Sequence, residues 1–399
     1  MIKMFDYKTD RLHGLDHLRA IAILLVMLFH YGRGVPSWLE PIKQIGWTGV
    51  DLFFVLSGYL IGFQLLKEIK DTNCLSLKGF YLKRFFRIIP AFLVVLILYY
   101  ALGNLRDGSG MPDLWRFLSF TQNLGLDAQN QNSFSHAWSL CIEEQFYLIL
   151  PFALLIIFNL KLRKGTPYII LALILLGFAL RYTIWQEHVQ PFVESGNRRG
   201  KIVSFFEQIY YPTYNRMDGL LLGVGIAAIF NYKPKLKASL TKYGNLMLLF
   251  GFGLFLIAYP ICENLMSYKT AIYGFPLVAL AYAVILIAAL SPSCILYRFK
   301  SKLSFIIATL SYAIYLTHKL VFHLTKMWIE KTGVEWLSEW TFWLCILIAL
   351  LAAFILHLSV EKPFLRLRKS LFDRQVKGNN ETKGELILNW IRNKAITRR

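Results

Sequence analysis

Long apolar runs constrain this chain more than any other feature. A helix needs roughly 20 mostly apolar residues to cross a bilayer, and the 399-residue sequence is 56% hydrophobic but only 17% charged. Because lipid offers the backbone no hydrogen bonds, such runs must form helices. The pattern predicts an all-α integral membrane protein, a bundle of about ten transmembrane helices. The predicted spans are 15–33, 48–66, 87–104, 143–160, 167–186, 216–231, 244–261, 271–290, 302–325 and 341–360.

The formal net charge of +20 comes from 44 lysine and arginine residues against 24 acidic ones. Most of the basic residues fall in alternate loops and in the two tails, as the positive-inside rule requires of cytoplasmic segments. This arrangement predicts that both termini are cytoplasmic. Contact with anionic membrane lipid explains the basic character, so no nucleic-acid partner is expected.

The first apolar run follows a basic tail, as a signal peptide does. It contains Arg19, however, and ends in His30 without a small-residue cleavage site, so it is interpreted as a retained first helix. The five cysteines form no CxxC pair and have no histidine at metal-ligand spacing. Neither a disulfide framework nor a metal site is predicted.

The sequence shows no repeat and no linker that would separate two domains. We expect one membrane domain over 1–365 and a basic cytoplasmic tail over 366–399, in which 385–395 forms either an amphipathic surface helix or a solvated segment. The longest outer loops are 105–142 and 187–215. Small-xxx-small spacing predicts close helix packing. The glycines concerned are Gly58 with Gly62 and Gly219 with Gly223.

Charged groups inside the first span are functional candidates, since ionisable side chains are costly in lipid. Asp16 and Arg19 are i,i+3 neighbours that can pair. Arg19 and His30 are eleven residues apart, which returns them to nearly the same helix face roughly 16 Å apart along the axis. Each alone is explained as an anchor or an interface residue, but together they favour a functional face.

Asp51 opens the second span in the sequence Gly49-Val50-Asp51-Leu52. If the first two spans form a hairpin, Asp51 lies near the level of His30 and can orient its imidazole. An N-cap of the second helix explains Asp51 equally well.

Three cations, Lys83, Arg84 and Arg87, converge at the start of the third span. Arginine forks suit phosphate groups. Ordinary positive-inside anchoring is the alternative explanation.

Ahead of the fourth span, Ser139, Glu143 and Tyr147 recur every four residues on one helix face, and Glu144 adds a second acid. This pattern suits a base, an acid or a substrate clamp. A carboxylate stabilised by the helix dipole explains one of the two glutamates more easily than both.

Two weaker sets follow. Arg216 and Asp218 stand at the outer start of the sixth span, where a structural ion pair is the simplest interpretation. Ser311, Tyr315 and His318 fall within about 60° of one another on the ninth span. They either line a cavity or satisfy one another across helices.

These motifs, in this order, resemble the acyltransferase 3 family of bacterial multi-span membrane acyltransferases over about residues 10–365. The motifs are Asp16 with Leu18-Arg19-Ala20 running to His30, Gly49-Val50-Asp51-Leu52-Phe53-Phe54-Val55-Leu56-Ser57-Gly58, Arg84/Arg87-Ile88-Ile89-Pro90, Trp138-Ser139-Leu140 with Glu143-Glu144-Gln145-Phe146-Tyr147, Arg216-Met217-Asp218-Gly219, Ser311-Tyr312-Ala313-Ile314-Tyr315-Leu316 with His318, and Glu361-Lys362-Pro363.

The resemblance implies a multi-pass enzyme of the bacterial inner membrane. It would move an acyl group, commonly acetyl, from a cytoplasmic acyl-CoA such as acetyl-CoA to a hydroxyl of a cell-envelope glycan, lipid-linked sugar or small molecule. It implies that activity depends on Arg19, His30 and Glu143. Many relatives carry an appended periplasmic hydrolase-like domain, and none is expected here after the tenth span. Any periplasmic hand-off would then need a separate periplasmic partner, or there would be no relay at all. No permanently bound cofactor is expected.

Physical chemistry adds two expectations to this resemblance. The phosphates of coenzyme A call for the cations Arg19, Lys83, Arg84 and Arg87. A hydroxyl acceptor needs a general base, and His30 is the natural candidate, as base or as acyl-carrying nucleophile. The alternative function is a proton-coupled secondary transporter or exporter, because intramembrane His, Asp and Arg also build proton relays.

Overall fold

The computed structural model describes residues 12–162, 165–333 and 335–373, and the described chain is helical without a strand. Within the described ranges, nine helical segments are long and apolar enough to cross a membrane, and Asp218–Tyr232 is a shorter apolar helix. Each predicted span coincides with one of them. These helices are α1 (His13–Tyr31), α3 (Thr48–Thr72), α4 (Leu77–Ala101), α6 (Trp138–Asn159), α7 (Thr166–Ile184), α10 (Asp218–Tyr232), α12 (Gly244–Ile261), α13 (Phe275–Ala289), α15 (Lys302–Lys331) and α16 (Glu339–Leu356).

The segments between the spans carry more helix than the apolar pattern alone predicts. Residues 187–215 fold into a run of short turns, in which two π-helical segments flank two short helices. The π-segment η6 continues α7 without a break, so a single helix runs from Thr166 to Glu194. The elements are η6 (Trp185–Val189), α8 (Gln190–Glu194), α9 (Arg198–Ser204), η7 (Phe205–Tyr210) and η8 (Thr213–Asn215), with α2 (Glu40–Gln44), α5 (Leu114–Leu118) and η4 (Ser135–Ala137) in other loops.

Close packing of α3 against α10 confirms the role expected of the spaced glycines. A Cβ atom at Gly58 would lie 2.1 Å from the Leu220 carbonyl oxygen, and one at Gly223 would lie 2.4 Å from the Val55 carbonyl oxygen. Only glycine allows the two backbones to approach this closely. This contact fixes the starts of both helices, which carry polar residues described below.

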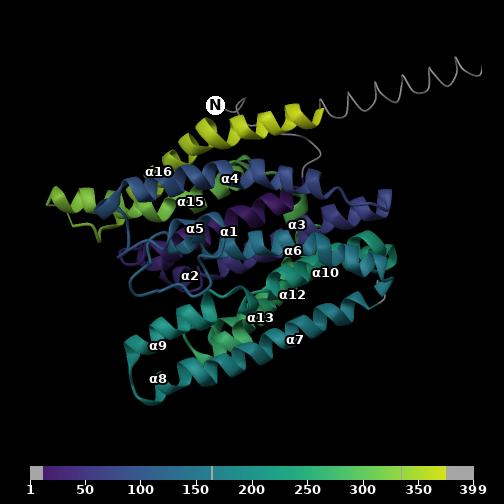
Figure 1. Cartoon of the computed structure of the whole chain (residues 1–399), viewed down its shortest axis with the longest axis horizontal. Helices are drawn as coiled ribbons and strands as arrows, with labels where there is room; N and C mark the ends of the chain where they lie inside the picture. The colour runs from purple at the N-terminus through teal and green to yellow at the C-terminus, as the bar shows by residue number, and fades with distance from the viewer. Residues whose placement is uncertain (1–11, 163–164, 334, 374–399) are drawn as a thin grey trace, which may run out of the picture. The chain divides into compact units, whose positions relative to one another are not determined.

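The described residues form two compact units: 12–75 with 99–353, and 76–98 with 354–373. Within the first unit, α12 and α13 lie side by side (Figure 1). In the second unit, the helix that begins as α16 continues through η10 (His357–Glu361) to Asp373, beyond the predicted end of the tenth span. The predicted amphipathic segment 385–395 lies outside the described residues.

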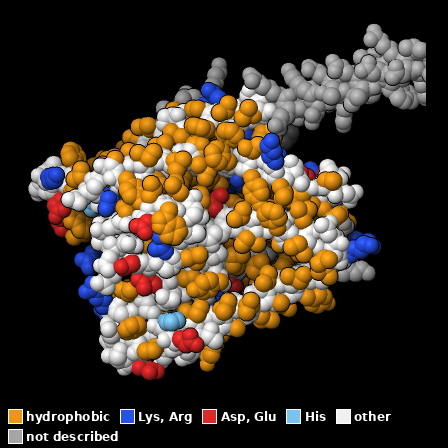
Figure 2. Space-filling model, in the orientation of Figure 1, with side chains coloured by type: hydrophobic (Ala, Val, Ile, Leu, Met, Phe, Trp, Pro, Cys, Tyr) orange, Lys and Arg blue, Asp and Glu red, His pale blue; other side chains and the backbone are white. Residues whose placement is uncertain are grey.

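Apolar side chains cover much of the surface over the spanning helices (Figure 2). On α12, for example, Leu249 is 68% exposed and Ile257 is 59% exposed. Such a surface is expected where lipid, and not water, surrounds the helices. The surface over α8 and α9 differs, because it is mainly polar with scattered charges (Figure 2).

Candidate active site

Three histidines from three different elements meet inside the first unit. His30 lies in the last turn of α1, His136 lies in η4 just before α6, and His318 lies midway along α15. The ring centroids are 5.0 Å apart for His30 and His318, 5.1 Å for His136 and His318, and 6.0 Å for His30 and His136. We call these three residues the histidine cluster.

The hydrogen bonds of the cluster define which nitrogen of each ring carries a proton. His318 Nδ1 lies 3.0 Å from the Ile314 carbonyl and 2.9 Å from the Tyr315 carbonyl, so it must be a donor. In the neutral ring its Nε2 is then an acceptor, 3.1 Å from His30 Nδ1. His30 Nδ1 also lies 3.1 Å from the Val26 carbonyl, and since both neighbours accept, it carries the proton. The lone pair of neutral His30 is therefore on Nε2.

His30 lines a cavity of about 190 Å³ together with Trp138, Tyr210 and Lys319. The Lys319 ammonium is fixed by an ion pair of 2.9 Å with the Asp107 carboxylate and donates a hydrogen bond of 3.1 Å to the Ser135 hydroxyl. A positioned cation and an unprotonated imidazole nitrogen thus belong to the same cavity. Such a pair can take a proton and stabilise a developing negative charge.

His136 is 2% exposed, and among the described residues its ring nitrogens make no hydrogen bond of good geometry, with only the Leu316 backbone near the ring. Buried polar groups are rarely left without a partner, so this ring is a candidate to contact a ligand. Its backbone is fixed: the Tyr315 hydroxyl donates to the His136 carbonyl, and Ser139 Oγ lies 2.6 Å from that hydroxyl. Ser139 and Tyr315 therefore support the cluster.

A second polar group surrounds Glu143 on the face of α6 that the sequence predicted. Ser57 and Tyr147 donate hydrogen bonds of 3.0 and 2.6 Å to Glu143 Oε2. Glu144 follows Glu143 on α6, outside the lining of the cavity. Within the described chain, neither Glu143 nor Asp51 is a hydrogen-bond partner of His30.

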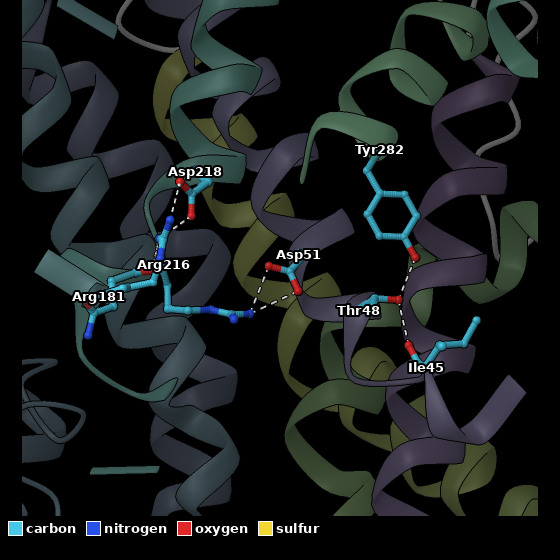
Figure 3. Close-up of polar contacts among 8 residues, drawn as sticks. Ile45, Thr48, Asp51, Arg181, Arg216, Asp218 and Tyr282 are labelled. Carbon is cyan, nitrogen blue, oxygen red and sulfur yellow. Dashed lines mark hydrogen bonds and ion pairs between the residues drawn. The ribbon is translucent and has the colours of Figure 1, made fainter. Parts of the chain in front are cut away.

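Asp51 instead forms a buried ion pair with Arg216, with Arg216 Nη2 2.9 and 3.0 Å from the two carboxylate oxygens (Figure 3). Asp218 pairs with Arg181 of α7 at 2.7 Å. The predicted pair of Arg216 with Asp218 is therefore wrong. The physical reason is local: Arg216 precedes the helix in a non-helical conformation, whereas α10 begins at Asp218, so the two side chains diverge.

Aromatic rings enclose the Arg216 guanidinium, whose central carbon lies 3.8 Å from the Phe275 ring centroid and 4.8 Å from that of Tyr210. Such faces stabilise a desolvated cation. Tyr210 and its neighbour Tyr211 also line the cavity. Burial raises the pKa of Tyr211 to about 12, so its hydroxyl stays neutral and serves as a hydrogen-bonding wall.

Comparison with known proteins decides the family. The family model described as an acyltransferase domain matches residues 12–358. The chain belongs to the acyltransferase 3 family. It is 30% identical over 93% of its length to the peptidoglycan O-acetyltransferase OatA of Listeria monocytogenes, and 29% identical over 93% to the O-acetyltransferase OatA of Staphylococcus aureus. These matches cover 58% and 61% of the two relatives, so the chain spans about three-fifths of their length. No solved structure matches the chain.

In this member of the family, the cations predicted to bind a donor lie in both units. Arg19 is on α1 with Asp16, in the first unit. Lys83, Arg84 and Arg87 lie in the first turns of α4, in the second unit. There the Arg368 guanidinium is 3.5 Å from the Lys83 carbonyl, and its charge interacts with those of Arg84 and Arg87. The second unit therefore gathers four cations.

Sequence reasoning missed His136, Lys319, Asp107 and Arg181 as site or support residues. Arg181 and Lys319 had a signal, since each is a charge inside an apolar run. His136 stands two residues before the Trp138-Ser139-Leu140 motif. Asp107 had none, because its loop approaches α15 only in the folded chain.

Proposed function

We propose that this protein is an O-acetyltransferase of the bacterial inner membrane, which moves an acetyl group from cytoplasmic acetyl-CoA to a hydroxyl of a cell-envelope glycan. Membership of the acyltransferase family supports the reaction class, and the peptidoglycan O-acetyltransferase among its relatives supports a glycan acceptor. The observation that carries the proposal is His30, whose Nε2 lone pair belongs to the same cavity as a fixed ammonium group.

The proposed step is direct transfer. His30 Nε2 accepts the proton of the acceptor hydroxyl while that oxygen attacks the thioester carbonyl carbon. The carbon–sulfur bond then breaks, the coenzyme A thiolate leaves, and the proton on His30 passes to it, so the imidazole is restored. His318 holds the His30 ring through Nδ1, and general-base catalysis of this kind contributes about 100- to 10,000-fold.

The tetrahedral intermediate carries a negative charge on the former carbonyl oxygen. Lys319 is the cavity-lining ammonium that can face this oxygen, and its ion pair with Asp107 holds it in place before reaction. Fixed charges of this kind stabilise the transition state without reorganisation. Glu143 is assigned to substrate positioning, since two hydroxyls donate to its Oε2 and it does not line the cavity that contains His30.

On the donor side, each unit would supply its own cations for the phosphates of coenzyme A. These are Arg19 in the first unit, and Lys83, Arg84 and Arg87 with Arg368 in the second. This assignment agrees with cytoplasmic termini, because these residues then stand at the cytoplasmic ends of their helices. Acetyl-CoA is a substrate here, and no bound cofactor enters the step.

A direct assay tests the proposal. Purified protein in lipid nanodiscs is incubated with radiolabelled acetyl-CoA and soluble peptidoglycan strands, and labelled glycan is measured. We expect His30→Ala to lower transfer by about 100- to 10,000-fold. The matched control His323→Ala, a histidine of α15 outside the cluster, should retain transfer.

Full transfer by correctly folded His30→Ala protein would refute the role of His30. Accumulation of unmodified glycan in sealed vesicles, with no acetyl transfer by the unaltered protein, would replace the proposal by the transporter function.

A further inference from the structure

A polar trough lies next to the histidine cavity. It consists of two adjoining hollows of about 510 and 390 Å³, which share Gln129, Val203, Glu207 and Gln208. Because the same side chains line both, the hollows form one continuous surface depression. It is built from the loops 105–142 and 187–215, and residues of α8 and α9 form part of its lining.

The π-segment η7 and the residue after it form the wall between the trough and the histidine cavity. Glu207 and Gln208 line the trough, whereas Phe206, Tyr210 and Tyr211 line the cavity that holds His30. The wall is therefore one turn of chain thick. A ligand with several linked units would therefore need to pass only this one turn of chain to reach from the trough to the cavity.

The trough is shaped before any ligand binds. The Ala128 amide donates a hydrogen bond of 2.8 Å to Glu207 Oε1, which holds the loop 125–130 against η7. Asp127 accepts further bonds from the backbone of Gln129 and Asn130 and from the Asn130 side chain, and these bonds lower the pKa of its carboxyl. The loop is thus a fixed wall.

The lining has the chemistry of a saccharide site. The side-chain amides of Gln129 and Gln208 make no hydrogen bond within the described chain, so each keeps donors and an acceptor for a ligand. Phe192 offers an apolar ring face, and the acids Glu207 and Asp127 offset the cation Arg199. A neutral, hydroxyl-rich chain fits these groups better than a polyanion does.

We propose that this trough binds the sugar units that flank the reacting hydroxyl, so that the acceptor is an oligosaccharide chain of several residues. The inference rests on the proposed function and names the substrate class of the same site. It places the chain across Gln129 and Gln208, with the reacting sugar past η7 beside His30.

The test uses a tetrasaccharide of N-acetylglucosamine and the free monosaccharide as acceptors for the full-length protein with acetyl-CoA. Gln129→Ala and Gln208→Ala should each raise KM for the tetrasaccharide about three- to tenfold, the effect of one lost hydrogen bond, with kcat nearly unchanged. KM for the monosaccharide should not change, because it reaches the cavity without filling the trough. The control Gln186→Ala removes an exposed glutamine of η6 that does not line the trough.

The outcomes separate the two proposals. Equal KM values for the tetrasaccharide in both trough variants, the control and the unaltered protein would overturn the trough while leaving acetyl transfer intact. A fall in kcat for both acceptors would also overturn it, since the glutamines would then act on the chemistry or the fold. Absence of transfer to either acceptor by the unaltered protein, with no acetylated glycan in the strand assay, would instead overturn the proposed function.

Discussion

The apolar interior of the first unit contains two polar groups, and they differ in how their side chains are paired. In the ion pairs of Asp51 with Arg216 and of Asp218 with Arg181, each carboxylate lies against a guanidinium at 2.7 to 3.0 Å. In the histidine cluster the rings lie against one another, and His30 and His136 line a cavity. Both groups consist of residues that are costly in lipid.

The difference shows how a structural charge can be distinguished from a functional one. A charge that holds the fold pairs with an opposite charge away from the cavity, as Arg216 does with Asp51, even though Arg216 Nε and Nη1 make no hydrogen bond within the described chain. A group that acts on a substrate lines a cavity, as His30 and Lys319 do. Intramembrane polarity alone does not separate the two cases.

The largest expected effect comes from breaking the ion pair between Asp51 and Arg216. Asp51→Leu leaves the Arg216 charge buried without its partner, and we expect it to lower the free energy of unfolding by about 3–5 kcal/mol. The double variant Asp51→Leu with Arg216→Met removes both charges and should recover most of that loss. Thermal unfolding in detergent measures both effects, and Asp71→Leu, which replaces an exposed aspartate of the same helix, is the control.

Acetyl transfer by the double variant of Asp51 and Arg216 tests whether this ion pair is structural or belongs to the active site. If the pair is structural, transfer returns with stability. A stable double variant without activity would move Asp51 or Arg216 into the active site.

For Lys319, which lines the cavity with His30, we expect that removing both partners of the ion pair restores stability but not activity, unlike in the pair of Asp51 with Arg216. Lys319→Ala should lower kcat about 100- to 1,000-fold, the usual effect of removing a group that stabilises an oxyanion. It also leaves Asp107 buried without its cation, so stability falls too. The double variant Lys319→Ala with Asp107→Ala should regain stability but not activity.

The control is Lys331→Ala, an exposed lysine at the end of the same helix. Recovery of transfer in the Lys319 and Asp107 double variant would show that this pair, like Asp51 with Arg216, only holds the fold.

The spans were predictable because the signal for each is local. An apolar run such as 244–261 carries its own length and composition, and the helix that forms has those same bounds. The fold of 187–215 was not predictable in this way, because its π-turns follow from packing against neighbouring helices and not from apolar periodicity. The glycine spacing was intermediate, since it indicated close packing without naming the partner helix.

In the candidate site too, residues could be predicted from the sequence, but the contacts between them could not. His30, Ser139, Tyr315 and His318 were candidates from their positions along single helices. Their contacts were not predictable, since His318 and His30 are 288 residues apart in sequence and meet only when α15 packs on α1. Arg216 and Asp218 were assigned to each other because they are neighbours in sequence, and the start of α10 between them sends their side chains to different partners.

The smallest of these expected effects concerns His318, which does not line the cavity and acts through His30. His318→Leu removes the Nε2 acceptor that holds the Nδ1 proton of His30, and a misaligned base should lower kcat by about 10- to 100-fold. His318→Gln places a carbonyl oxygen near the same position, so it should restore part of the rate. KM for acetyl-CoA and for the glycan should stay constant in both variants, and steady-state kinetics measures all three quantities.

A purely structural His318 would give another pattern. Both variants would then lose activity in proportion to their loss of folded protein, and glutamine would have no advantage over leucine. Because His318 donates to two carbonyls of its own helix and accepts from His30, only the bond to His30 crosses between helices. Rescue by glutamine at equal stability therefore assigns the effect to that single bond and keeps the histidine cluster distinct from the buried ion pairs.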